Sequence, residues 1–131
     1  MEEKIIEFKD GIPGFEEYKN YVLVLNEDEE NPFHKLQSVE AEELSFLVIN
    51  PFLIDKNYEF KLKDNTIDAL KIESEVDLAV FSIVKVPEKI QDITVNLAAP
   101  IVINSKSKLG KQIVLENSNY SIRHKLNRGE E

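Results

Sequence analysis

Apolar residues fall in short runs along the whole chain, and polar or Pro/Gly breaks separate these runs. A run of about four to eight residues that is continuously apolar, or that alternates apolar and polar positions, is typical of a β-strand. The pattern therefore predicts nine short strands, at residues 5–8, 21–25, 33–39, 45–49, 58–62, 78–86, 93–97, 101–103 and 112–115. We expect residues 120–126 to form one more ordered segment.

One segment has a helical pattern instead. Asp64 or Thr66 is a candidate helix cap, and Ile67 and Leu70 follow at helical spacing. We predict a helix over residues 64–73, of about two and a half turns.

The spacing of the strands indicates an all-β arrangement. Strand starts lie about 8–12 residues apart, which is typical of an antiparallel sandwich or barrel. Strands do not alternate with long helices, so a parallel doubly wound sheet is disfavoured. Pro100 interrupts an apolar run and cannot donate to a strand ladder, so we predict a bulge or a change of strand partner there. We expect a mainly β domain with one or two short helices, at 64–73 and at 16–19.

Length and composition restrict the setting of this domain. A chain of 131 residues predicts one domain over 1–131, with residues 127–131 frayed. Cysteine is absent, which excludes disulfides and Cys-based zinc sites. The N-terminus lacks a basic start followed by an apolar stretch, so we expect no secretory signal. The longest apolar run, residues 97–103, is far shorter than the roughly 20 residues of a membrane span, and we expect a cytoplasmic protein.

The negative charge is unevenly distributed. Residues 1–65 hold 7 Lys/Arg and 16 Asp/Glu, a balance of −9, whereas residues 66–131 hold 9 of each. An acidic surface repels phosphate backbones, so direct nucleic-acid binding is disfavoured. Long-range attraction favours a basic protein partner. The alternative is that the acidity only keeps the protein soluble.

Candidate chemistry is sparse. His34 and His124 are the only histidines, too few for a His-based zinc site. A Ser-His-Asp arrangement stays open because its order in sequence is not fixed, but no Gly-x-Ser-x-Gly motif supports it. The four glycines make no phosphate-binding loop, and the acidic run 27–30 lacks the alternating ligands and central Gly of a calcium loop. We therefore predict no catalytic, metal-binding or cofactor-binding residue.

Six segments, in order from residue 8 to residue 124, carry a recognisable set of motifs. They read Phe8-x-Asp10-Gly11-Ile12-Pro13-Gly14-Phe15-Glu16, Pro32-Phe33-x-x-Leu36-Gln37-Ser38, Val48-x-Asn50-Pro51-Phe52, Thr94-Val95-Asn96-Leu97-x-Ala99-Pro100-Ile101-Val102-Ile103-Asn104, Gly110-x-Gln112-x-Val114-Leu115 and Tyr120-x-x-Arg123-His124. Together they resemble the flagellar assembly factor FliW family. The resemblance implies a compact, antiparallel β-barrel-like protein of the bacterial cytoplasm. It also implies two partners, flagellin before its export and the translational regulator CsrA, which the family antagonises and which exchanges with flagellin.

The resemblance directs attention to two sets of surface residues. An amphipathic helix of flagellin needs exposed apolar anchors, and Ile12, Phe15, Phe33 and Phe52 are candidates because each lies beside turn residues. Core packing is the alternative for each of them. The acidic loop is expected to steer the basic CsrA; its residues are Glu27, Asp28, Glu29 and Glu30.

Two other kinds of protein remain open from the residues alone. A small-ligand-binding or enzymatic β-barrel would have an enclosed pocket with converging polar groups. A structural subunit would have a large, self-complementary apolar patch.

Overall fold

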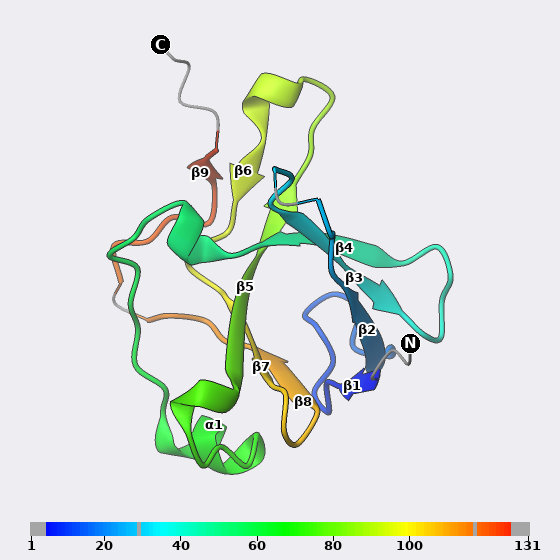
Figure 1. Ribbon diagram of the computed structural model, residues 1–131, viewed down its shortest axis with the longest axis vertical. Helices are drawn as coiled ribbons and strands as arrows, with labels where there is room; N and C mark the ends of the chain where they lie inside the picture. Colours follow the sequence, from blue (N-terminus) through cyan, green and yellow to red (C-terminus); the bar gives the residue numbers. More distant parts are fainter. Residues whose placement is uncertain (1–4, 29, 117, 127–131) are drawn as a thin grey trace.

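The computed structural model describes residues 5–28, 30–116 and 118–126, and Figure 1 shows their arrangement. The strands are β1 (Ile5–Glu7), β2 (Asn20–Val24), β3 (Phe33–Ser38), β4 (Ser45–Ile49), β5 (Leu78–Lys85), β6 (Thr94–Val95), β7 (Ile101–Asn104), β8 (Leu109–Gln112) and β9 (His124–Lys125). The helical elements are α1 (Asp64–Ala69) and three 3₁₀ turns, η1 (Pro51–Leu53), η2 (Glu75–Asp77) and η3 (Ile90–Asp92). The prediction of a mainly β fold with short helices is confirmed. The expected fraying of 127–131 falls outside the described residues.

Seven strands close into a barrel. The order around the ring is β1-β2-β3-β4-β5-β7-β8, and β8 returns to β1. Every neighbouring pair is antiparallel except β1 and β8, which run parallel and share the single pair Glu7↔Leu109. A backbone hydrogen bond from Glu7 N to Lys108 O, at 3.0 Å, fastens this seam. The strands therefore form a closed barrel and not an open sandwich.

The inside of the barrel is filled by side chains. Phe8 and Tyr21 pack edge to face with their ring centroids 5.3 Å apart, and both are fully buried. Leu36, Phe81 and Ile101 face each other across the interior, and the space between them is too small for a water molecule. Within the part of the chain that the structure describes, the barrel interior is therefore a packed core.

Pro100 lies at a break in the pairing along β5, where we predicted a bulge or a change of strand partner. β6 and β7 both pair with the same edge of β5. Val84 of β5 pairs with Val95, and Phe81 pairs with Ile101. A step of three residues along β5 therefore matches six residues on the opposite chain, which has three extra residues between β6 and β7. β9 pairs with the other side of β6 and extends the sheet beyond the ring.

Residues 50–77 form a cover segment that lies on the outside of the barrel. In Figure 1 this segment leaves β4, runs down beside β5 and returns through α1 and η2 to the start of β5. Two predictions for it are wrong. Residues 58–62 belong to no strand, and the helix ends at Ala69 instead of residue 73. The helix stops early because Lys71 takes a positive φ of 55°, a left-handed conformation that cannot continue an α-helix.

Three strand predictions near the C-terminus are shifted or too long. The strand predicted at 112–115 is β8, Leu109–Gln112, and the one at 93–97 shrinks to β6, Thr94–Val95. The ordered segment expected at 120–126 contains only the two-residue β9. The shift of β8 places Gly110 opposite Ile103 in the ladder.

Candidate functional site

An apolar groove of about 700 Å³ lies between the cover segment and the outer face of the barrel. Its floor is made by Leu78 and Val80 of β5 and Val102 of β7, which point outward because their neighbours along each strand point into the core. Its walls come from residues 58–62 and from the α1 region. The apolar side chains that line it are Phe52, Tyr58, Phe60, Leu62, Ile67, Ile72, Leu78, Val80 and Val102.

The rim of this apolar groove is charged and mainly acidic. Glu59, Asp64 and Glu75 carry negative charges and Lys61 carries a positive one, and all four side chains are exposed. The groove therefore combines an apolar floor with a polar edge, the usual arrangement at sites that bind other molecules.

Tyr58 anchors the cover segment at one end of the groove. Its hydroxyl donates to Leu97 O at 2.7 Å, and its ring lies 4.6 Å from the Tyr120 ring and 5.6 Å from the Phe52 ring. Burial raises the pKa of Tyr58, so the hydroxyl stays protonated and remains a donor at all physiological pH values. The hydroxyl of Tyr120 in turn accepts from Glu59 N at 3.0 Å.

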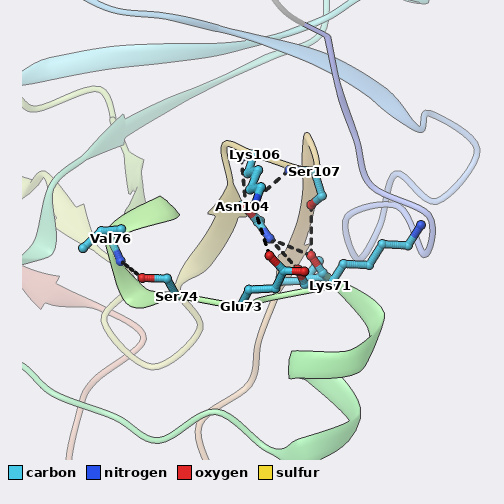
Figure 2. A network of polar contacts seen from close by, with 8 residues as sticks. Lys71, Glu73, Ser74, Val76, Asn104, Lys106 and Ser107 are labelled. Carbon is cyan, nitrogen blue, oxygen red and sulfur yellow. Dashed lines mark hydrogen bonds and ion pairs between the residues drawn. The ribbon is translucent and has the colours of Figure 1, made fainter.

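Asn104 fastens the other end of the cover segment, as Figure 2 shows. Its side-chain amide donates to Leu70 O at 2.8 Å and to Lys71 O at 3.2 Å. Its carbonyl oxygen accepts from Lys106 N at 2.9 Å, and Ser107 Oγ donates to Leu70 O at 2.9 Å. One buried amide thus joins the end of α1 to the hairpin between β7 and β8.

The four predicted apolar anchors lie in different places. Phe52 is 42% exposed and lies at the apolar groove. Phe15 is 39% exposed and packs edge to face on Phe46, away from the groove. Phe33 is half-buried and lines a second, separate cleft beside the acidic loop, which is described below.

The expectation that Ile12 reaches the surface is wrong. Only 1% of Ile12 is exposed, and it packs into the main core of the barrel. The positive φ of Gly11, 70°, turns the chain inward at this point, and Ile12 O accepts from Phe15 N at 2.7 Å. The tight turn buries its first apolar side chain and exposes Phe15.

The acidic loop is exposed and internally hydrogen-bonded. Asn26 Oδ1 accepts from Asp28 N at 2.8 Å, and Asp28 Oδ1 accepts from Glu30 N at 3.0 Å. Glu27, Asp28 and Glu30 are exposed, and within the described ranges none of them pairs with a cation. Glu29 lies outside the described residues. The loop presents unneutralised negative charge on a backbone held in place by short-range turns.

A second cleft, of about 510 Å³, lies at the base of the acidic loop. Leu25, which is 59% exposed, lines it together with Phe33, His34 and Leu47. His34 Nδ1 accepts from Asn26 N at 2.9 Å, which ties β3 to the start of the loop. Apolar surface and negative charge are thus adjacent here.

The described residues contain no cluster of three or more His, Cys, Asp or Glu side chains that could hold a metal ion. Within the same ranges, no helix is long and apolar enough to cross a membrane.

Sequence reasoning overlooked most of the groove. Tyr58, Phe60 and Leu62 were assigned to a half-buried strand, and Tyr120 was given no role. The alternation of residues 58–62 indicates which side chains face inward, but nothing in the sequence separates this segment from the barrel strands.

Comparisons with known proteins agree on one family. A family model described as "FliW protein" matches residues 1–126. A flagellar assembly factor FliW of Clostridium novyi (strain NT) is 50% identical over 125 residues, which cover 95% of this chain and 87% of the relative. The protein of the same description from Alkaliphilus metalliredigens (strain QYMF) is 48% identical over 123 residues, 94% of this chain and 76% of the relative. A solved structure, "Crystal structure of the flagellar assembly factor FliW", superposes with a TM-score of 0.88 at 44% identity, over 97% of this chain and 88% of that chain.

Proposed function

Because the chain belongs to the FliW family of flagellar assembly factors, we propose that it binds flagellin before export and binds and antagonises the translational regulator CsrA. It acts in the cytoplasm by protein–protein contact and without catalysis. When flagellin is exported, the freed protein takes up CsrA, so that flagellin level controls flagellin translation. The observation that carries this proposal is the family match over residues 1–126.

The apolar groove supports the flagellin part of the proposal. A chaperone-like protein must cover apolar surface that its client will later bury in an assembly, so it needs exposed apolar surface of its own. Phe52, the predicted anchor at the groove, is 42% exposed, and the floor below it is apolar. Truncating a central aromatic anchor typically weakens binding by about 2 kcal/mol or more.

The acidic loop supports the CsrA part. An RNA-binding protein presents basic surface, and unpaired carboxylates attract such a surface over about 8–10 Å at physiological salt. Glu27, Asp28 and Glu30 meet this condition because they are exposed. Negative charge held beside an RNA site also weakens phosphate binding by repulsion.

A small-ligand-binding or enzymatic barrel is less well supported. Such proteins enclose their ligand inside the barrel, whereas here Leu36, Phe81 and Ile101 fill the interior. The groove outside the barrel is lined mainly by apolar side chains.

Isothermal titration of the purified chain with monomeric flagellin, and separately with CsrA, tests the proposal directly. We expect saturable binding of both partners at moderate salt, and displacement of CsrA when flagellin is added. Phe52→Ala should weaken flagellin binding, and Val39→Ala, at an exposed apolar residue outside the groove and outside the predicted anchors, is the control. Failure to bind either protein would remove the proposal.

The role of the acidic loop is tested by reversing Glu27, Asp28, Glu29 and Glu30 to Lys. Four reversals of two units each change the net charge from −9 to −1, and we expect association with CsrA to slow by about tenfold or more at low salt. The control reverses four other exposed carboxylates, at Glu42, Glu43, Asp68 and Glu88. If both variants slow association equally, net charge and not the loop is responsible; an unchanged rate in the loop variant contradicts steering by the loop.

A further inference from the structure

Residues 58–63 have the alternating burial of an extended chain and carry unused backbone hydrogen-bonding groups. Their burial alternates, with Tyr58, Phe60 and Leu62 turned toward the protein and the residues between them exposed. Lys63, at the end of the segment, has the extended angles φ −75° and ψ 155°. Within the described ranges, the N–H and C=O groups of Phe60 and Leu62 have no hydrogen-bond partner in the protein.

One edge of this segment is occupied in part, by a hydrogen bond at Glu59. Tyr120 accepts from Glu59 N, and Glu116 pairs with Lys63 at 3.3 Å, so Tyr120 and Glu116 both lie on that edge. In an extended chain, the N–H and C=O of one residue point to one side and those of the next residue point to the other. The groups of Glu59 and Lys61 therefore face Tyr120 and Glu116, and those of Phe60 and Leu62 face the opposite side.

The apolar groove lies on that opposite side. Its lining includes Phe60, Leu62 and the floor residues Leu78 and Val80, and it includes none of the described residues 113–120. A chain placed in the groove would thus lie beside the free edge and above an apolar surface.

We propose that the apolar groove binds an extended segment of a partner protein, which adds as a β-strand to residues 59–62. Main-chain hydrogen bonds to Phe60 and Leu62 supply part of the affinity, and the groove selects apolar side chains at every second position of the guest. The rim holds three carboxylates, of Glu59, Asp64 and Glu75, against one ammonium, of Lys61. The guest's outward positions are therefore neutral or basic.

The free edge decides between a strand and a helix as the guest. A helix satisfies its own backbone groups and would leave those of Phe60 and Leu62 facing a surface that offers no donor or acceptor. A strand beside them, at about 4.8 Å, matches each group with a partner. The inference rests on the proposed function in taking flagellin as the partner, and it replaces the expected helix-in-groove contact by strand addition.

Amide hydrogen exchange on the full chain, alone and saturated with monomeric flagellin, tests the inference. We expect the amides of Phe60 and Leu62 to exchange at least about tenfold more slowly in the complex, as new hydrogen bonds require, and the amide of Lys61 to change less. Binding of flagellin without protection at Phe60 and Leu62 overturns strand addition and leaves the proposed function intact. Absence of flagellin binding overturns both the proposed function and the inference. Protection of Phe60 and Leu62 that rises with the concentration of the chain alone assigns the groove to a second copy and also overturns the inference.

A pair of proline variants provides a second test. Leu62→Pro removes an N–H on the free edge, and we expect flagellin affinity to fall about tenfold relative to Leu62→Ala, which removes the side chain only. Lys61→Pro removes an N–H on the occupied edge and should stay within about threefold of the unmodified chain. Equal affinities for Leu62→Pro and Leu62→Ala contradict the proposal. If Leu62→Pro fails to fold by circular dichroism, the exchange measurement decides.

Discussion

The barrel and the cover segment are built from the same alternating pattern but are stabilised in different ways. Each barrel strand is hydrogen-bonded to neighbours on both sides, and most of the side chains in the main core are almost fully buried. The cover segment has no ladder partner and is tied to the barrel through a few side chains, chiefly Tyr58 and Asn104. Most of its apolar side chains are half-buried or exposed. The barrel therefore carries the stability, and the cover segment keeps surface available for a partner.

The largest effect is expected in the barrel, at Phe8. This side chain is fully buried, packs against Tyr21 and occupies the space that Gly110 leaves, because a Cβ on Gly110 would lie 2.6 Å from Phe8 Cζ. Phe8→Ala should lower the free energy of unfolding by about 3–5 kcal/mol, measured by chemical denaturation. Phe15→Ala, at a partly exposed ring, is the control and should cost about 1 kcal/mol. Similar losses in both variants would contradict the assignment of stability to the closed core.

The cover segment should respond differently, at Asn104. Asn104→Ala removes the donor to Leu70 O and Lys71 O and the acceptor of Lys106 N. We expect the free energy of unfolding to fall by about 1–3 kcal/mol. Amide exchange should accelerate more at Leu70 and Ile72 than in β2 and β3.

The matched control for this variant is Asn57→Ala. Asn57 lies on the same cover segment, and its side chain is exposed. This change should leave both stability and exchange nearly unaltered. Uniform acceleration of exchange in the barrel and the cover segment of Asn104→Ala would show that the two regions open together, against the division drawn above.

The same division explains which elements the sequence could predict. Residues 21–25, 33–39, 45–49 and 78–86 match β2 to β5 closely, because the alternation and the flanking turn residues act locally. The pattern at 58–62 is equally clear, yet these residues form no strand. Alternation reports which side chains face inward, whereas a strand also needs a neighbouring chain, and that neighbour is fixed only by the tertiary fold.

The sequence also could not predict the register of β8 or the direction in which side chains point after a turn. The apolar residues 113–115 suggested the last barrel strand, but β8 lies earlier because Gly110 must lie against the Phe8 ring, where no side chain fits. Ile12 and Phe52 both follow turn residues, and only Phe52 is exposed. A turn marks a change of chain direction, and it does not determine on which side of the turn the next side chain is buried.

The smallest effect concerns the weakest part of the barrel, the parallel seam between β1 and β8. Lys111 of β8 pairs with Asp10 at 2.8 Å, and the hydrogen bond and charge of Lys111 lower the pKa of Asp10 below its ordinary value of 3.8. The stabilisation from this pair is fully present above pH 3.8 and disappears as the pH falls through the lower, folded-state pKa.

Because both side chains are partly exposed, Asp10→Asn should cost only about 0.2–1 kcal/mol at pH 7. The difference from the unmodified chain should shrink toward zero in acid denaturation curves, and Asp68→Asn, at an exposed carboxylate outside the ion pairs of the described residues, is the control and should leave stability at pH 7 nearly unaltered. A loss in Asp10→Asn that is the same at pH 7 and about pH 2, below the unfolded-state pKa, would mean that the seam is stabilised by contacts other than this charge pair.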